Sequence, residues 1–213
     1  MKPKSKKCKV CKSEFMPYRS TQKVCGMNCA IIEAKAKEKK KAEEKKKLTE
    51  KMKWDLITPN EYRKKYFQSV VNECIRIIDN GQPCICRPNE LGQDAGHFIS
   101  TGSNLTLSLN FHNIHLQSRN SNGFRGGESL KFYKGLERVY GKEYAEFCDQ
   151  LQQCEPLHLN KYEMKTARER LMKFRRRIRK EISKPLDASK RIELRNEANG
   201  ITNIYEKKYS KYL

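Results

Sequence analysis

Two short blocks of sequence decide the fold of this 213-residue chain, and a polar turn follows them. They read Asp94-Ala95-Gly96-His97-Phe98-Ile99-Ser100 and Asn113-Ile114-His115-Leu116-Gln117, and the turn carries Asn122. Residues 104–117 alternate loosely between apolar and polar side chains, which is typical of a strand. We therefore expect a hairpin with His97 on its first strand and Asn113 on its second. A following helix would bring Asn122 back against the hairpin.

The side chains of this hairpin suit the hydrolysis of a phosphodiester with one metal ion. The carboxylate of Asp94 and the amide oxygen of Asn122 are hard ligands, which Mg²⁺ and Mn²⁺ prefer. An unligated His97 would take a proton from water as general base, and Asn113 would orient its imidazole. The metal would stabilise the charge that grows on the phosphate and the leaving oxygen. For His115 two interpretations stay open, support of the site and contact with DNA.

Four cysteines near the N-terminus form two closely spaced pairs. Two residues separate Cys8 from Cys11, and three separate Cys25 from Cys29. Two thiolate pairs on tight turns can complete a tetrahedron around Zn²⁺, and metal binding supplies folding free energy that 30 residues cannot obtain from a core. We predict a structural zinc here, because four protein ligands leave no open position for catalysis.

The charge of the chain indicates a polyanionic partner. There are 46 Lys and Arg against 25 Asp and Glu, a formal net charge of +21. Nucleic acid is the expected partner, because neutralised phosphates release condensed counterions. A membrane surface would require an amphipathic helix with a bulky apolar face, which the basic stretches lack. We expect a cytosolic protein, because no apolar run reaches roughly 20 residues and no signal peptide is evident.

Composition and charge divide the chain into five parts. Hydrophobic residues make up 37%, below the usual ~45–50%, so we expect one small core in an α+β, mostly helical fold. The expected parts are a four-cysteine zinc module (1–30), a charged helical spacer (31–55), the core (56–158), a basic helix (159–185) and a polar tail (186–213). Contacts with DNA phosphates, which confer affinity without sequence readout, are expected from Arg119, Arg125, Lys173, Arg175, Arg176, Arg177 and Arg179.

The hairpin residues resemble a known family. Asp94-Ala-Gly-His97, Asn113-Ile-His115-x-Gln117 and Asn122 are similar to the HNH (His-Me finger) nucleases. More narrowly, they resemble the lambda NinG family, also called Rap, of phage recombination endonucleases, over roughly residues 5–180. The resemblance implies a ββα-metal fold and metal-dependent nicking of branched DNA such as D-loops and Holliday junctions. It also implies that His97 is the general base, Asn122 a metal ligand and Asn113 the second-strand Asn.

The chain departs from these relatives at two places. Many HNH sites carry the metal carboxylate directly before the His, where this chain has Gly96, so Asp94 is the nearest acid. Relatives also carry two Cys pairs that form a zinc knuckle. Here the first is compressed to Cys84-x-Cys86, and Ser118 and Ser121 replace the second. Because serine is a poor zinc ligand, we predict no zinc at this knuckle. Packing should hold the finger instead, through Phe98, Ile99, Leu107, Leu109, Ile114, Leu116 and the helix near Phe132.

We therefore predict a structure-specific DNA endonuclease of phage type that uses Mg²⁺ or Mn²⁺ and carries an N-terminal zinc. It would act in the host cytoplasm, and host or phage recombination proteins are further candidate partners. The alternative is a non-catalytic junction-binding protein with a degenerate site. A weaker third is an RNA- or ribosome-associated zinc protein. Symmetric cutting of a junction would favour a homodimer, although no heptad seam is evident.

Overall fold

The computed structural model describes residues 4–126 and 128–210, and it divides the chain into two compact units, Met1–Ile57 and Thr58–Leu213. Residues 1–3 of the expected zinc module and residues 211–213 of the expected tail lie outside the described residues. Most of the structure is helical, and the strands form two small antiparallel ribbons. The expectation of a mostly helical α+β chain is confirmed.

The N-terminal unit contains a short ribbon and a long helix. Strand β1 (Lys6–Lys7) pairs with β2 (Glu14–Phe15), and α1 (Met27–Leu56) follows. The helix forms because Ala, Glu and Lys are strong helix formers and the segment has no Gly or Pro. It buries none of its side chains. Ion pairs one turn apart, such as Lys37 with Glu33 at 3.2 Å, add local support.

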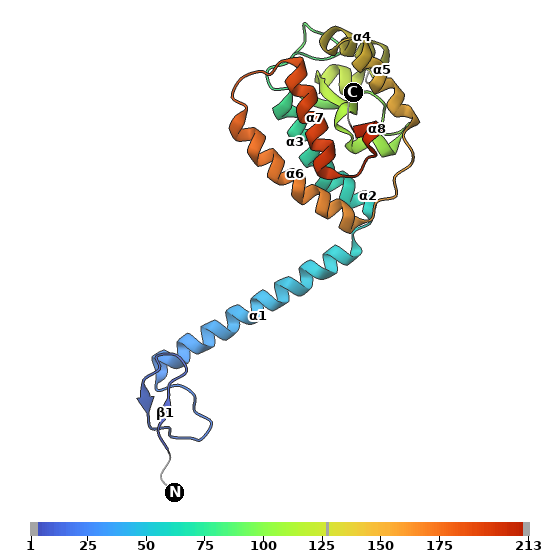
Figure 1. Ribbon diagram of the computed structural model, residues 1–213. Coiled ribbons are helices and arrows are strands. Elements are labelled where there is room, and N and C mark those ends of the chain that lie inside the picture. The colour runs from blue at the N-terminus through green and yellow to red at the C-terminus, as the bar shows by residue number, and fades with distance from the viewer. Residues whose placement is uncertain (1–3, 127, 211–213) are drawn as a thin grey trace. The chain divides into compact units, whose positions relative to one another are not determined.

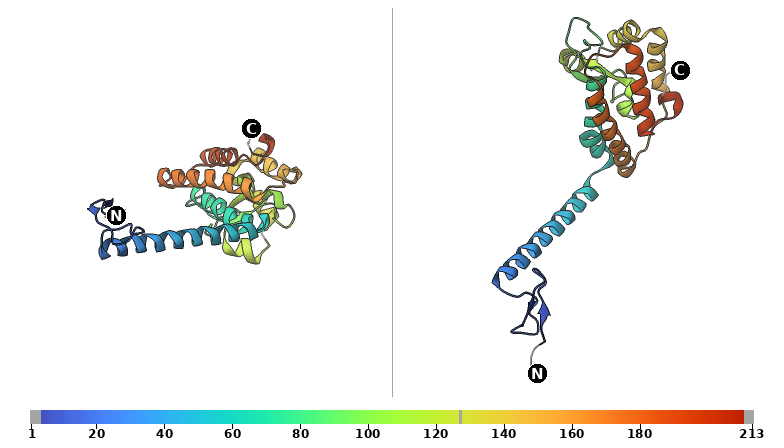
Figure 2. Two further views of the ribbon diagram at one scale, coloured as in Figure 1. Left: turned by 90° about the horizontal axis from the view of Figure 1, so that it is seen from below. Right: turned by 60° about the vertical axis from the view of Figure 1, so that its left-hand side comes forward.

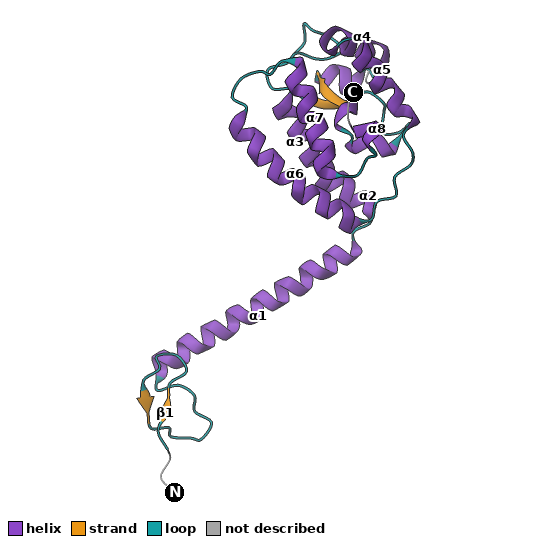
Figure 3. Ribbon diagram, in the orientation of Figure 1, coloured by secondary structure: helices purple, strands orange, loops and turns teal. Residues whose placement is uncertain are grey.

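The C-terminal unit, called the body below, surrounds a second ribbon with helices (Figure 1; Figure 3). The elements are, in chain order, α2 (Pro59–Tyr62), η1 (Arg63–Phe67), α3 (Gln68–Ile78), β3 (Asp94–His97), η2 (Leu105–Leu109), η3 (Phe111–Asn113), β4 (Ile114–Gln117), η4 (Asn120–Phe124), α4 (Ser129–Tyr140), α5 (Lys142–Gln150), η5 (Leu151–Gln153), α6 (Lys161–Glu181), α7 (Ala188–Thr202) and α8 (Lys207–Ser210). No helix in the described ranges combines the length and the apolar character that a membrane crossing needs.

The body begins with a capped helical segment. The Thr58 hydroxyl accepts a hydrogen bond from the Glu61 amide, and the Glu61 carboxylate accepts one from the Thr58 amide, so both open backbone donors are satisfied. The segment runs through a π-helical turn to Ile78 and buries one apolar face, made of Val70, Val71, Cys74, Ile75 and Ile78.

The ribbon of β3 and β4 is antiparallel. Its register pairs His97 with Ile114 and Gly96 with His115. Successive side chains of a strand point to opposite faces, so His97 and His115 leave opposite faces of the ribbon. The packing that we expected is confirmed for Ile99, Leu107, Leu109, Ile114, Leu116 and Phe132, which are all buried, whereas Phe98 is half-buried.

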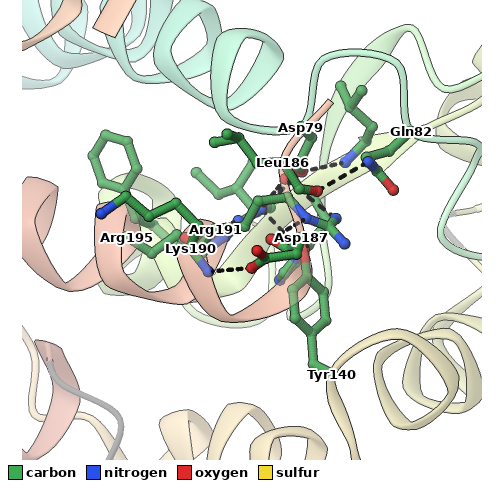
Figure 4. A network of polar contacts seen from close by, with 12 residues as sticks. Asp79, Gln82, Tyr140, Leu186, Asp187, Lys190, Arg191 and Arg195 are labelled. Carbon is green, nitrogen blue, oxygen red and sulfur yellow. Dashed lines mark hydrogen bonds and ion pairs between the residues drawn. The ribbon is translucent and has the colours of Figure 1, made fainter. Parts of the chain in front are cut away.

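The segment predicted to be a polar tail forms part of the core, so that prediction is wrong for residues 188–202. Helix α7 packs beside α6 (Figure 1; Figure 2), and Arg195 is 0% exposed. Figure 4 shows Arg191 and Arg195 reaching from α7 toward Asp79 at the end of α3. Arg195 Nη2 lies 2.8 and 2.7 Å from the two Asp79 carboxylate oxygens. The buried side chains of α7 are largely polar, and they form hydrogen bonds and ion pairs inside the core. A search for hydrophobic periodicity cannot detect burial of this kind.

Candidate functional site

The four N-terminal cysteines come together in a cluster with the geometry of a zinc site. Their sulfur atoms all lie within 4.8 Å of one another, and the Cys11 and Cys25 sulfurs are 3.5 Å apart. A tetrahedral ion with Zn–S bonds of about 2.3 Å would separate its ligands by about 3.8 Å. The donor set therefore fits zinc, with Cys8 and Cys29 as the other two ligands.

The electrostatics of this cluster also favour a bound cation. Contacts with Cys11 and Cys29 raise the pKa of Cys25 to about 12, because neighbouring thiolates repel one another. A divalent cation would offset that repulsion and hold all four sulfurs ionised.

His97 lies at the end of β3, half-buried beside the loop that joins the two strands. Its Nε2 is 3.0 Å from the backbone carbonyl of Ser108. A carbonyl only accepts, so Nε2 carries the proton and Nδ1 keeps its lone pair. Burial lowers the pKa of His97, and the positive charge of Arg63 lowers it further. The neutral imidazole is thus fixed as the tautomer that can act as a base through Nδ1.

Asn113 lies at the end of η3 and fastens the loop that follows His97. Its side-chain oxygen accepts from the Ile99 amide at 2.8 Å, and its amide donates to the carbonyls of Ile99 and Leu107. Leu107 directly precedes Ser108, whose carbonyl accepts from the imidazole. Asn113 therefore positions His97 through the backbone, whereas we expected the amide to contact the imidazole itself.

His97 and Asn122 line the same cleft, which has a volume of about 810 Å³. Asn122 is exposed on η4, the π-helical turn between β4 and α4. Ser100, Ser129 and Tyr133 also line it. The structure thus brings the expected base and one expected metal ligand together.

Asp94 and His115 lie elsewhere. Asp94 shares a ribbon face with Gly96 and His115, opposite His97, and its carboxylate is 3.9 Å from Arg119 Nε. Asp94 is not among the described residues that line the cleft. His115 is 1% exposed and contacts Arg195 and the rings of Phe132 and Tyr140. The structure therefore contradicts the contact with DNA considered for His115, because its imidazole is enclosed in the core, whereas its support of the site stays a prediction.

A carboxylate that the sequence did not suggest lines the cleft with His97 and Asn122. It belongs to Asp149, near the end of α5, and accepts a hydrogen bond of 2.7 Å from Gln152. Asp149 lies 52 positions after His97 in the sequence. Only the packing of α5 brings it to the cleft, so no local pattern could have identified it.

A polar cluster occupies the place where relatives are expected to hold a second zinc. Ser118 donates to Glu90, Ser121 donates to Glu128 at 2.7 Å, and Arg87 makes a two-pronged contact with Glu128 at 2.7 and 3.0 Å. These bonds join the segment before β3, which contains Arg87 and Glu90, to the segment after β4, as a shared metal ion would. We call this group, with Cys84 and Cys86, the knuckle cluster.

The basic side chains expected to contact DNA fall into two groups. Several are held in ion pairs within the body: Arg175 and Arg179 with Glu73, Arg177 with Glu181 and Glu197, Arg125 with Glu90, and Arg119 weakly with Asp94. Lys173 and Arg176 are exposed on α6. An intramolecular ion pair competes with a phosphate, so Lys173 and Arg176 are the better placed for DNA.

Comparisons with known proteins place the chain in a family of phage proteins. A family model described as Bacteriophage Lambda NinG protein matches residues 1–188. Protein ninG of Escherichia phage 933W is 33% identical over 159 residues, 67% of this chain and 79% of the relative. Protein ninG of Enterobacteria phage H19B is 31% identical over the same shares of both chains. No solved structure matches the chain.

Proposed function

Because the chain belongs to the NinG family of bacteriophage proteins, we propose that it is a divalent-metal-dependent, structure-specific DNA endonuclease. It nicks branched recombination intermediates such as D-loops and Holliday junctions in the cytoplasm of the host cell. The body then contains an HNH-type core, with β3 and β4 as its ribbon and the segment from Asn122 into α4 as its helical part. The observation that carries the proposal is the cleft that His97 and Asn122 line together.

His97 acts as the general base in this proposal. Its Nε2 proton is held by the Ser108 carbonyl, so Nδ1 takes the proton from the attacking water. Asn113 keeps the loop in place, so the imidazole needs no reorganisation during the reaction. A neutral imidazole is required for this role, and its lowered pKa provides it at neutral pH.

The cleft has oxygen donors suited to a hard divalent cation. Asn122 offers an amide oxygen and Asp149 a carboxylate, the ligand types that Mg²⁺ and Mn²⁺ take. A bound cation would supply charge stabilisation at the phosphate and the leaving oxygen. Asp149 is the better candidate for the carboxylate, because Asp94 leaves the opposite face of the ribbon.

Affinity for DNA comes from the basic surfaces in this proposal. Exposed cations on α6, with Lys173 and Arg176 among them, and the ten lysines between Glu33 and Lys53 would contact phosphates without reading sequence. The zinc module of residues 1–30 would add a rigid contact at the other end of the spacer. Recombination proteins of the phage or its host, and a second copy of the chain, remain proposed partners.

The test is nicking of labelled four-way junction, D-loop and linear duplex DNA with Mg²⁺ or Mn²⁺. The proposal expects nicks in the branched substrates and few in the duplex. Asp149→Asn should reduce nicking strongly, whereas Asp94→Asn, a matched change on the opposite face, should reduce it little. Cleavage of all three substrates at equal rates would exclude structure specificity.

A second candidate function is junction binding without cleavage. It is favoured by Gly96 directly before His97 and by the placement of Asp94 outside the cleft. Tight junction binding with no nicking under either metal would select this function.

A further inference from the structure

An exposed aromatic side chain belongs to the segment that contributes to the cleft. Phe124, the last residue of η4, is 84% exposed, and Leu130 at the start of α4 is 69% exposed. Asn122 and Gly126, on either side of Phe124 in the sequence, both line the cleft, as does Leu130. The sequence alone offers no reason to expect base stacking, because its aromatic residues are spaced like those of a core.

The segment that presents Phe124 is fastened on both sides. Ser121 is buried and donates to Glu128, while the Arg125 guanidinium donates to Glu90 at 3.0 Å and the Arg125 amide to the Asn120 carbonyl at 3.0 Å. The knuckle cluster thus anchors the turn. Phe124 is exposed on an ordered support, and a rigid aromatic group loses little entropy when it contacts a partner.

A single exposed apolar residue is common on protein surfaces. Phe124 differs in its surroundings, because its segment and the exposed Leu130 both contribute to the cleft, in a strongly basic chain of charge +21. Arg119, one residue before η4, is itself largely exposed. An apolar tip flanked by positive charge is suited to DNA, where a ring stacks on a base while cations contact the neighbouring phosphates.

Continuous duplex DNA offers no free base face to such a tip. A branch point does, because stacking is interrupted where strands exchange. We propose that Phe124 acts as a wedge: its ring stacks on the base exposed at a DNA branch and so places the adjoining strand at the cleft that His97 lines. The assignment of branched DNA as the partner rests on the proposed function. In this arrangement the wedge supplies the preference for branched over linear DNA.

Binding measurements test this proposal independently of cleavage. The full chain is titrated, without added Mg²⁺ or Mn²⁺ and without chelator so that structural zinc is retained, into a four-way junction and a linear duplex of the same sequence. The junction carries 2-aminopurine at its branch. Phe124→Ala should weaken junction binding by about 5- to 100-fold, the range for loss of one base–aromatic stack. It should leave duplex binding unchanged and abolish the change in 2-aminopurine emission that the native chain produces.

Two further variants serve as controls. Phe124→Trp should retain the junction preference, because tryptophan also stacks. Tyr162→Ala removes another exposed aromatic ring, 60% exposed at the start of α6, and should change neither affinity. Phe124→Ala with a native junction-to-duplex ratio would overturn the proposal, as would an equal loss on both DNAs.

The same variants distinguish this proposal from the nuclease assignment. If the native chain nicks no DNA but Phe124→Ala still loses the junction preference, the wedge stands and the nuclease fails. If Phe124→Ala binds and nicks as the native chain does, the nuclease stands and the wedge is overturned.

Discussion

The two faces of the β3–β4 ribbon each carry a histidine, and the two imidazoles have opposite environments. His97 is half-buried at an open cleft, and its Nε2 donates to the Ser108 carbonyl. His115 is enclosed, with Nε2 donating to the His112 carbonyl and Nδ1 accepting from Arg195 at 3.1 Å. Both nitrogens of His115 are thus engaged in the core, whereas His97 is anchored through Nε2 and lines the cleft. The alternation along one short ribbon thus places one imidazole at the cleft and the other in the core.

The largest expected effect is the loss of nicking when His97, on the cleft face, is replaced. His97→Ala should reduce the rate of junction nicking by about 10²- to 10⁴-fold, the usual contribution of a general base. The thermal unfolding temperature should stay close to that of the native chain, because the imidazole lies at the edge of the core. His158→Ala, a change at an exposed histidine, is the matched control and should leave both quantities unchanged.

The next largest effect is a loss of stability when Arg195, which contacts His115 on the enclosed face, is replaced. Arg195→Met leaves the Asp79 carboxylate, 2% exposed, without its closest cation. The free energy of unfolding should fall by about 3–5 kcal/mol in urea titrations, because the buried carboxylate keeps only the longer contact of 3.7 Å with Arg191. The nicking rate per folded molecule should not change. Arg176→Met, at an exposed site on α6, should have little effect on stability.

A double variant sharpens this test. In Asp79→Leu/Arg195→Met both charges are absent, so the loss of stability should be smaller than in Arg195→Met alone. If the double variant were the less stable of the two, the loss of the closest cation from a buried carboxylate would not be the cause.

Two buried histidines, His112 in η3 and His115 on the enclosed face, should also make stability depend on pH. Burial lowers the pKa of His112 to about 3, and burial likewise lowers the pKa of His115. Both imidazoles bind protons more readily in the unfolded chain, whose histidines titrate near about 6.5. Stability is therefore full above about pH 6.5 and decreases as pH falls toward about 3. Urea unfolding between about pH 7 and 5 measures this slope, and a flat profile would contradict the burial of neutral imidazoles.

Loss of the structural zinc should have the smallest effect on the stability of the body that contains the ribbon. One structural zinc is expected at Cys8, Cys11, Cys25 and Cys29, and a polar cluster without metal at the knuckle. Elemental analysis should find one zinc per native chain and none in Cys25→Ser. Loss of that zinc should unfold the N-terminal module, while the urea midpoint of the body stays unchanged. Two zinc ions per native chain would show that the knuckle also binds metal.

Several features of the fold and of the candidate site could be predicted from the sequence. The pairing of the four cysteines, the Thr58–Glu61 capping box and the apolar face of α3 follow local rules of spacing. The motif also places His97 and Asn122 at one site. Local patterns succeed here because each feature is completed within a few residues or one hairpin.

Other features depend on contacts between distant segments. Arg195 meets Asp79 across 116 positions, and Asp149 reaches the cleft only through the packing of α5. Helix α7 has no apolar signature, because its buried residues include Arg191, Arg195, Asn199 and Thr202, which look like surface residues in a sequence. The family model also ends at residue 188, where α7 begins. His115 and Asp94 lie outside the cleft because alternation along the ribbon places them opposite His97.

The most direct test of His97 as the base is chemical rescue of His97→Gly on a four-way junction with Mg²⁺. We predict that this variant nicks slowly and that added imidazole, but not an equal amount of a non-basic solute, restores part of the rate. The restored rate should rise with pH as free imidazole loses its proton. Nicking by His97→Gly at the native rate without imidazole would contradict the assignment of His97 as the base.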